Sequence, residues 1–319
     1  MKRTKSTRAI TATIAIGLSL GLAACGGDSG GDSVAGTGAG GDGDALAGAT
    51  LTVGSKEFTE SILLGKITAI ALTDAGAKVT DKTGISGSAT VRAALESKEI
   101  DLYWDYTGTG WVNILGNPPT DLPANLYEAV STADKKNGIA WLKPAPFENA
   151  YAIAVSKAFA KENSVTSLSD AVTYIKANPT ASSICAASEF INRDDGLPGL
   201  QKAYGTKFSS VNELDFNLIF TQVGKSCPFG EVTTTEGRVL SQDLQILEDD
   251  KDFFLEYLGV LTLRQETLDA NPKIADIMAP ISEKLTNEKI TELNSKVDVD
   301  GEEPQDVAQE FLDGEGLLG

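Results

Sequence analysis

Short apolar runs alternate along the chain with longer segments in which apolar residues recur every three or four positions. Strands are predicted over residues 49–53, 77–80, 100–103, 139–142, 151–155 and 183–187. Helices are predicted over residues 59–75, 91–97, 126–136, 169–177 and 196–204. Strands that alternate with helices of this length are typical of α/β layers, so we expect an α/β fold with largely parallel sheets.

The chain changes character beyond Phe253. From residue 261 to 293, and again from 304 to 311, the pattern is helical and contains no convincing strand. An economical arrangement has two α/β lobes, in which the chain crosses from the first lobe to the second and returns to finish on the first. The predicted lobes are lobe 1 with residues 49–149 and 258–319, and lobe 2 with residues 150–257.

The first residues have the character of a secretory signal. Four basic residues precede an uncharged apolar stretch from Ile10 to Leu22, and small residues follow it. This stretch is shorter than the roughly 20 residues that span a membrane. Leu22-Ala23-Ala24-Cys25 resembles a bacterial lipobox, in which the cysteine is acylated and becomes the new N-terminus. We therefore expect a lipoprotein signal peptide over residues 1–24 and a lipid anchor on Cys25, at the extracytoplasmic face of the cell membrane.

Residues 25–48 are predicted to form a flexible tether between this anchor and the fold. They are mostly glycine, aspartate, serine and alanine, and they show no periodic apolar pattern. Such a composition buries too little apolar surface to offset the entropy of the chain. A tether of this kind lets a globular body face a membrane partner from several angles.

Cysteine usage favours one disulfide. If Cys25 is acylated, Cys185 and Cys227 remain as an even pair in an exported protein. Two buried free thiols are the alternative, but an oxidising compartment favours a bond between them.

Composition removes several classes of function. The chain of 319 residues has 27 Lys and Arg, 45 Asp and Glu, no histidine, and a formal charge of −18. That charge counts against a nucleic-acid partner, whose phosphates demand a positive face. The absence of histidine excludes serine–histidine and cysteine–histidine catalysis and histidine–zinc sites. No phosphate-binding glycine loop or nucleophile elbow occurs, so we predict no catalytic residue, no cofactor and no metal ligand.

Aromatic residues are concentrated at one place in the chain. Tyr103, Trp104, Tyr106 and Trp111 surround the polar step Thr107-Gly108-Thr109, directly after a predicted strand. A loop is therefore expected at the carboxyl edge of a sheet, where open α/β sheets hold their ligands. Tyr103 and Trp104 are expected to pack in the core, whereas Tyr106 is expected to face a cleft.

At two segments the chain resembles the substrate-binding proteins of osmoprotectant ABC importers: Gly54-Ser55-Lys56-Glu57-Phe58-Thr59-Glu60 and Asp101-Leu102-Tyr103-Trp104-Asp105-Tyr106-Thr107-Gly108-Thr109. Further matches follow in order, at Asn149-Ala150-Tyr151-Ala152 and at Ser188-Glu189-Phe190 with Arg193. The resemblance implies a two-lobed periplasmic-binding-protein fold, type II-like, with a ligand cleft between the lobes. It also implies a monomer that binds glycine betaine, choline, carnitine or proline betaine and delivers it to an ABC permease.

The resemblance also implies roles for individual residues. A quaternary ammonium has no N–H to donate, so it is recognised by the negative faces of aromatic rings. The implied ligand residues are Tyr106, Tyr151 and Tyr257 around the ammonium, with Lys56, Thr109 and Arg193 on the ligand carboxylate. The alternative for each charged residue is a surface cation or an ion pair between the lobes.

Two positions depart from the family pattern. Where many relatives have Ala-Tyr-[ST]-Thr-Asp-Gly, this chain has Glu231-Val232-Thr233-Thr234-Thr235-Glu236-Gly237, and Val232 cannot replace the π face of a cage tyrosine. Either Phe229 or Trp104 compensates, or the pocket is more open on one side. Asn149, a predicted ligand residue, stands where relatives can carry aspartate, which removes one negative contact to the ammonium.

Two other hypotheses remain open, and the first of them is prompted by Val232. The first is a binding protein of the same fold for another zwitterion or an amino acid. The second, less favoured, is an exported enzyme that uses carboxylates such as those of Glu248-Asp249-Asp250. Acidic runs of that kind are more simply the solvated surface of an acidic exported protein.

Overall fold

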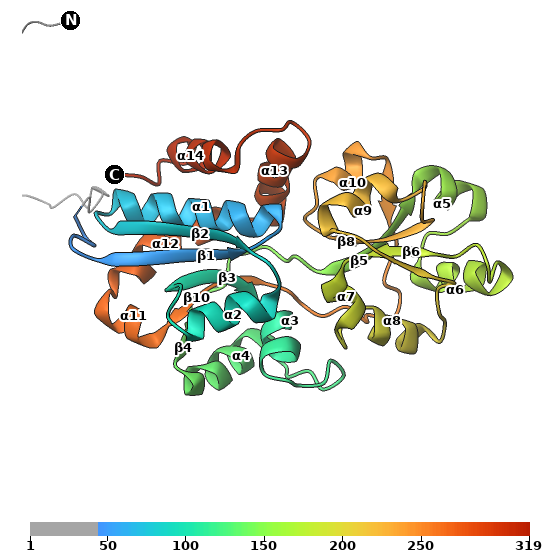
Figure 1. Cartoon of the computed structure of the whole chain (residues 1–319), viewed down its shortest axis with the longest axis horizontal. Coiled ribbons are helices and arrows are strands. Elements are labelled where there is room, and N and C mark those ends of the chain that lie inside the picture. The colour runs from blue at the N-terminus through green and yellow to red at the C-terminus, as the bar shows by residue number, and fades with distance from the viewer. Residues whose placement is uncertain (1–43) are drawn as a thin grey trace, which may run out of the picture. The chain divides into compact units, whose positions relative to one another are not determined.

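The computed structural model describes residues 44–319, which form two lobes, each built on a five-stranded sheet (Figure 1). The described residues do not include the predicted signal peptide, the predicted anchor at Cys25 or residues 25–43 of the predicted tether. Leu46, in the last part of the predicted tether, is buried in the core of lobe 1. No helix within residues 44–319 is long and apolar enough to cross a bilayer.

Lobe 1 contains the first four strands and the last strand of the chain. In chain order its strands are β1 (Thr50–Lys56), β2 (Lys78–Ile85), β3 (Leu102–Tyr106), β4 (Ile139–Trp141) and β10 (Gly259–Arg264). Across the sheet they follow the order β2-β1-β3-β10-β4. The helices are α1 (Thr59–Asp74), α2 (Ser88–Glu96), α3 (Thr107–Thr109), η1 (Gly110–Ile114), α4 (Leu126–Asp134), η2 (Lys135–Asn137), α11 (Gln265–Ala270), α12 (Lys273–Lys284), α13 (Asn287–Asp298) and α14 (Pro304–Gly314).

Helices cover both faces of the lobe 1 sheet, and its central strands are therefore buried on both sides. Every residue of β3 and of β10 is buried. Successive residues of a strand face opposite sides, so Trp104 packs into the core with α1 and α12–α14, while Tyr103 packs into the core with α2 and α4. Both residues are therefore core residues, as expected from the sequence.

Lobe 2 is a second mixed sheet with its own helices. Its strands are β5 (Tyr151–Ser156), β6 (Ile184–Ala186), β7 (Val211–Glu213), β8 (Phe229–Thr233) and β9 (Leu244–Ile246), in the spatial order β7-β6-β8-β5-β9. Its helices are α5 (Lys157–Asn163), α6 (Leu168–Ala177), α7 (Ser188–Asn192), α8 (Leu197–Tyr204), α9 (Phe216–Gln222) and α10 (Arg238–Ser241). Two apolar clusters pack on this sheet, as two clusters do in lobe 1.

Two predictions about the strands were wrong. The segment predicted as helical from residue 261 begins within β10, because a short apolar run that is buried on both faces lacks the alternation of a half-exposed strand. The sheets are also mixed rather than largely parallel. β10 runs antiparallel to β3 and β4, and β5 runs antiparallel to β8 and β9. β5 is the strand by which the chain enters lobe 2 from lobe 1, and β10 is the strand by which it returns to lobe 1.

The two segments that cross between the lobes run beside each other. One segment links β4 to β5 and the other links β9 to β10. Glu148 and Leu258 form an antiparallel bridge between them, and Asn149 N donates to Tyr257 O over 3.0 Å. This pairing places Asn149 and Tyr257 at the boundary between the lobes.

The disulfide between Cys185 and Cys227 is present in lobe 2. It joins β6 to the turn that precedes β8, and both cysteines are buried. The bond therefore holds together two neighbouring segments, each of which continues into a wall of the site described next.

Candidate functional site

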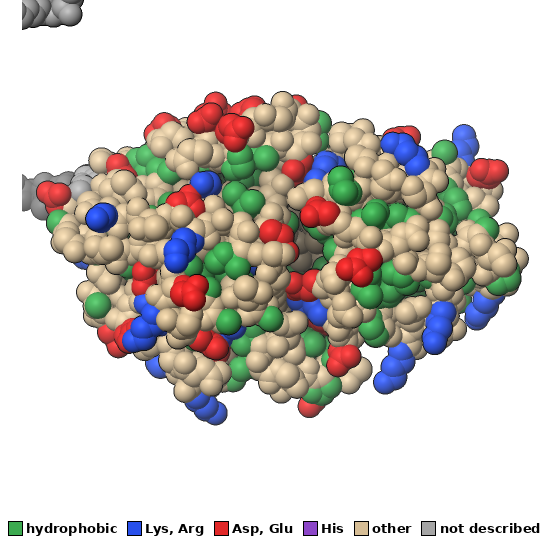
Figure 2. All heavy atoms as spheres, viewed as in Figure 1, with side chains coloured by type: hydrophobic (Ala, Val, Ile, Leu, Met, Phe, Trp, Pro, Cys, Tyr) green, Lys and Arg blue, Asp and Glu red, His purple; other side chains and the backbone are tan. Residues whose placement is uncertain are grey.

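A cavity lies where the two lobes meet, and Figure 2 shows a hollow there with acidic side chains around it. The cavity encloses about 100 Å³, which suits a small solute. Five aromatic side chains line it, from both lobes: Phe58, Tyr106, Tyr151, Phe216 and Tyr257. The charged residues of the lining are Lys56, Glu57, Glu189 and Glu231.

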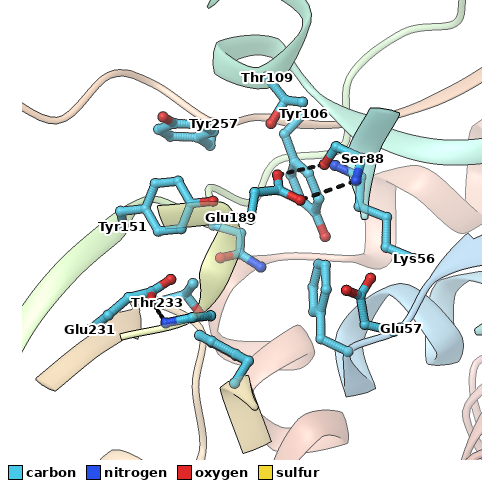
Figure 3. Close-up of a pocket in the computed structure, with 14 residues that line it drawn as sticks. Lys56, Glu57, Ser88, Tyr106, Thr109, Tyr151, Glu189, Glu231, Thr233 and Tyr257 are labelled. Atoms are coloured by element: carbon cyan, nitrogen blue, oxygen red, sulfur yellow. Dashed lines mark hydrogen bonds between the residues drawn. The ribbon is translucent and has the colours of Figure 1, made fainter. Parts of the chain in front are cut away.

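The structure brings six of the predicted ligand residues together around this cavity, namely Lys56, Tyr106, Thr109, Asn149, Tyr151 and Tyr257. The aromatic rings form two groups. Tyr151 and Tyr257 meet edge to face with their centroids 5.5 Å apart, and Phe58 stacks on Tyr106 at 6.2 Å. Figure 3 shows Tyr151 and Tyr257 on one side of the cavity and Lys56 on the other. Phe58 and Phe216 were not predicted to take part.

The local sequence explains how these rings are positioned. Tyr106 ends β3, and a helical turn follows at once where a loop was expected. Gly108 in that turn lies against Tyr257, since a Cβ atom on Gly108 would come within 2.6 Å of the Tyr257 ring. Glycine is therefore required for the ring of Tyr257 to pack against the end of β3.

Lys56 is part of a buried ion pair. Its Nζ donates to Asp105 Oδ1 over 2.7 Å, and both side chains are almost completely enclosed. The same ammonium lies 5.0 Å from the centre of the Tyr106 ring. Asp105 also accepts a hydrogen bond from Tyr103 over 2.6 Å. The sequence pattern alone did not indicate this pairing.

Arg193 lies behind the cavity wall and is not among its lining residues. Its guanidinium donates to both carboxylate oxygens of Asp195, at 2.8 and 2.5 Å. It also donates to Glu189 over 2.7 Å and, across the lobe boundary, to Thr109 Oγ1 over 3.3 Å. Tyr257 donates to the same Asp195 over 2.6 Å. Arg193 is thus the centre of a network that joins the two lobes.

Glu189 was missed by the sequence reasoning, although it stands in one of the matching segments. It accepts hydrogen bonds from Ser88 N at 3.0 Å and Ser88 Oγ at 2.7 Å, so a lobe 2 carboxylate caps the N-terminus of α2 in lobe 1 (Figure 3). Burial raises the pKa of Glu189, but Lys56, Arg193 and the bonds from Ser88 outweigh burial and hold that pKa at about 2. Glu189 is therefore ionised at neutral pH.

Glu231 is a second carboxylate that the sequence reasoning did not single out. It is only 2% exposed and, within residues 44–319, accepts one hydrogen bond, from Ala187 N to Oε2 over 2.6 Å. Burial raises its pKa to about 8; the bond from Ala187 opposes this rise and the charge of Glu189 adds to it. The environment of Glu231 therefore favours the neutral carboxyl, whereas that of Glu189, which also belongs to lobe 2, favours the ionised carboxylate.

The expectation for Val232 was wrong. Alternation along β8 directs Glu231 and Thr233 to the cavity and Val232 to the apolar core behind it. Counted back from Thr235-Glu236-Gly237, the position of the family tyrosine falls on Thr233. Neither Phe229 nor Trp104 compensates, because both are buried in the lobe cores.

Asn149 is directed to a buried carboxylate that was also missed. Its Nδ2 donates to Glu60 Oε1 over 2.6 Å, and Tyr106 donates to the same oxygen over 2.7 Å. Thr235 of lobe 2 and Asn294 donate to Glu60 Oε2, over 2.6 and 3.2 Å. Burial raises the pKa of Glu60, and these four donors oppose that rise. Four donors from two lobes thus converge on one carboxylate behind the cavity.

Comparison with known proteins identifies the family of this chain. A family model described as the substrate binding domain of ABC-type glycine betaine transport system (OpuAC) matches residues 49–314. The chain is 35% identical over 278 residues to a Pseudomonas aeruginosa protein named glycine-betaine-binding protein, covering 84% of this chain and 89% of that one.

Two further relatives support the match. One is the Helicobacter pylori protein named ergothioneine transport permease/ergothioneine binding protein EgtU, 30% identical over 269 residues, with 84% of this chain and 48% of that protein covered. The other is YehZ of Escherichia coli, named a glycine betaine-binding protein. Its solved apo structure is 30% identical, has a TM-score of 0.62, and is matched over 85% of this chain and 100% of that chain.

The expected two-lobed periplasmic-binding-protein fold is confirmed by the YehZ structure and by that of lactococcal OpuAC in its closed form with glycine betaine, which is 12% identical, has a TM-score of 0.59, and is matched over 85% of this chain and 98% of that chain. The protein is an extracytoplasmic binding protein of an ABC importer for quaternary ammonium osmoprotectants, and it is not an enzyme. The chain belongs to the family of substrate-binding domains of ABC-type glycine betaine transport systems.

Proposed function

We propose that this protein captures glycine betaine, choline, carnitine or proline betaine between its lobes and delivers it to an ABC permease. The observation that carries the proposal is the set of five aromatic side chains around one small cavity at the lobe boundary. Aromatic faces attract a quaternary ammonium that can donate no hydrogen bond. Tyr106, Tyr151 and Tyr257 are the proposed cage, and Asn149 contacts the ligand beside them.

The magnitudes are consistent with a useful affinity. Each ring contributes roughly 0.5–2 kcal/mol to binding of a cation, the larger value applying where the cation is desolvated. A micromolar dissociation constant corresponds to about 8 kcal/mol. Three or four rings therefore supply several kcal/mol, and buried methyl groups and polar contacts must supply the rest.

The proposed mechanism is closure of the two lobes around the ligand. Residues 49–149 and 258–319 move as one body and residues 150–257 as the other, about the paired crossing segments. The ligand shifts an equilibrium between open and closed forms by its greater affinity for the closed form. The closed form then docks on the permease, and the protein works as a monomer.

Anchoring through an acylated Cys25 is part of the proposal. Two or three acyl chains hold a protein on a membrane far more firmly than one. The test is fractionation of cells that express the full-length chain or its Cys25→Ser variant. We expect the parent in the membrane fraction and the variant outside it; a variant that still sediments with membranes contradicts the anchor.

Calorimetric titration of the purified protein tests the ligand class. The ligands are glycine betaine, choline, carnitine and proline betaine, with ergothioneine added because one relative is named for it. Free amino acids serve as controls. Saturable micromolar binding of a methylated ammonium, with none for amino acids, is the expected result. Binding of an amino acid in place of every methylated ligand would favour the alternative of another zwitterion.

A further inference from the structure

The two cations beside the cavity already have carboxylates of their own. Lys56 pairs with Asp105 at 2.7 Å, and Arg193 holds both oxygens of Asp195. All four side chains are at most 5% exposed. These two pairs balance in charge, which leaves Glu189 as a carboxylate in excess at the cavity wall.

Glu189 occupies the kind of site that a ligand carboxylate would be expected to fill. Its two oxygens receive Ser88 N and Ser88 Oγ at the N-terminus of α2, and one of them also receives Arg193 Nη1. The positive charges of Lys56 and Arg193 help to hold its pKa at about 2. A helix N-terminus with nearby cations is a general site for an anion. Here the protein supplies that anion itself.

The charge balance then discriminates between ligands. With Glu189 ionised, the five charged groups named above carry one net negative charge, and the other two carboxyl residues of the lining, Glu57 and Glu231, can only make it more negative. A bound cation reduces this negative charge, whereas a zwitterion adds a further carboxylate that must compete with Glu189 for the same donors. Unpaired charge in an enclosed site is costly, because water is no longer there to solvate it.

Glu231 places a second requirement on the ligand, namely a hydrogen-bond donor. Its Oε2 accepts from Ala187 N, but its Oε1 has no hydrogen-bond donor within residues 44–319, although the side chain is only 2% exposed and lines the cavity. A trimethylammonium group has no hydrogen to offer it. A ligand hydroxyl does, so Oε1 is the acceptor that an O–H donor on the ligand would satisfy.

We propose that this cavity takes a cationic quaternary ammonium that carries a hydroxyl group and no carboxylate, in preference to a zwitterionic betaine. The proposal rests on the function proposed above and narrows its ligand class. Glu189 is its charge-selecting residue and Glu231 its hydroxyl acceptor.

Two matched ligand pairs test the proposal on the unmodified protein. Choline and glycine betaine differ by a hydroxymethyl group against a carboxylate, and choline and ethyltrimethylammonium differ by the hydroxyl alone. In calorimetric titrations we expect choline to bind at least tenfold more tightly than glycine betaine and severalfold more tightly than ethyltrimethylammonium. Equal or tighter binding of glycine betaine would overturn the proposal while leaving the proposed function intact. Silence from all methylated ligands would instead refute the proposed function.

Charge-neutral variants assign the effect to particular residues. Glu189→Gln keeps the shape of the side chain and removes the excess charge, so the preference for choline over glycine betaine should fall at least fivefold. Glu231→Met removes both carboxylate oxygens at a similar side-chain length, so it should remove the difference between choline and ethyltrimethylammonium. Glu162→Gln, at an exposed position of the same lobe, is the matched control and should change neither ratio.

Unchanged ratios in both site variants would overturn the assignment to Glu189 and Glu231. Circular dichroism and thermal melting are recorded for each variant. If a variant does not fold, the ligand pairs on the unmodified protein still decide the proposal.

Discussion

The hydroxyl of Tyr106 donates a hydrogen bond to Glu60 Oε1 over 2.7 Å, and Glu60 is enclosed by residues of both lobes. Tyr106 presents its ring to the cavity, while Thr235 of lobe 2 donates to the other oxygen of Glu60. One carboxylate thus connects a cavity ring to a contact between the lobes. The ring and the hydroxyl of Tyr106 consequently have separable effects.

Tyr106→Ala is expected to weaken ligand binding at least tenfold, because it removes an aromatic face from the cavity. Tyr106→Phe is its matched control, since it keeps the ring and removes only the donor to Glu60. The phenylalanine variant should bind within a few fold of the parent but lose about 1–3 kcal/mol of stability, the cost of one lost donor to a buried group. Titration calorimetry and urea unfolding measure the two effects. Near-parental affinity of Tyr106→Ala would refute the cage.

Ser88→Ala is expected to weaken binding of choline and glycine betaine severalfold and by similar factors. Ser88 Oγ bonds Glu189 across the lobe boundary, so its removal destabilises the closed arrangement whichever ligand is present. Ser97→Ala, just beyond the other end of α2, is the control. An effect on one ligand only would show that Ser88 contacts that ligand rather than stabilising closure.

Choline affinity is expected to rise as pH increases from 6 through about 8. Burial raises the pKa of Glu231 to about 8, so its carboxyl is largely protonated in the empty cavity at neutral pH. A bound cation favours the ionised carboxyl and therefore competes with this proton. Titrations at several pH values should show the rise in the parent and a flat profile in Glu231→Gln. A parallel rise in both proteins would assign the pH dependence to another group.

The same carboxyl makes stability depend on pH in the opposite sense. Its folded pKa of about 8 lies above the ordinary value of 4.5, so its contribution is complete below pH 4.5 and is lost as pH rises toward 8. Glu189, with a folded pKa of about 2, contributes above pH 4.5 and loses its contribution as pH falls. The free energy of unfolding of the ligand-free protein should therefore decline less steeply from pH 5 to 8 in Glu231→Gln than in the parent.

Removal of the disulfide is expected to lower the free energy of unfolding by up to about 4 kcal/mol, the chain-entropy estimate for a loop of this length. The two cysteines are 42 residues apart in the sequence and buried in lobe 2. Urea unfolding of the double variant Cys185→Ser/Cys227→Ser measures the loss. Addition of reductant should destabilise the parent and leave the double variant unchanged.

Much of the fold could be predicted from periodicity, because most elements bury one regular face. The first helix, several strands and the passage of the chain into a second lobe and back follow from that pattern. β10 escaped because both of its faces are buried, so its sequence lacks a polar alternation. The direction of strands cannot be read from periodicity at all, which is why the antiparallel entry of β5 and β10 was not anticipated.

The cavity lining contains the three predicted tyrosines and Lys56, whereas the aromatic residues Phe58 and Phe216 and the carboxylates of the site were not predicted. Tyr106 and Tyr151 stand in segments whose spacing matches a family. Glu60, Glu189 and Glu231 acquire their roles from donors far away in the sequence, such as Ser88, which lies 101 positions from Glu189. Only the folded chain brings these groups together. At Val232 the family tyrosine was matched one residue too early along β8. A shift of one residue along a strand moves a side chain from the face that lines the cavity to the face that packs in the core.

The pairing of the two crossing segments has a consequence for how ligand preference can change. Asn149 and Tyr257 line the cavity and are also joined, backbone to backbone, at the place where the chain passes between the lobes. A substitution at either position alters the walls and the pivot together, so its effect on selectivity is mixed with an effect on opening. Glu231, on β8, pairs in register with Ile153 and so lies further into lobe 2 than Thr233, which pairs with Tyr151 next to the crossing segment. New specificities are therefore expected to arise at Glu231, where a cavity wall can change without changing the segments about which the lobes close.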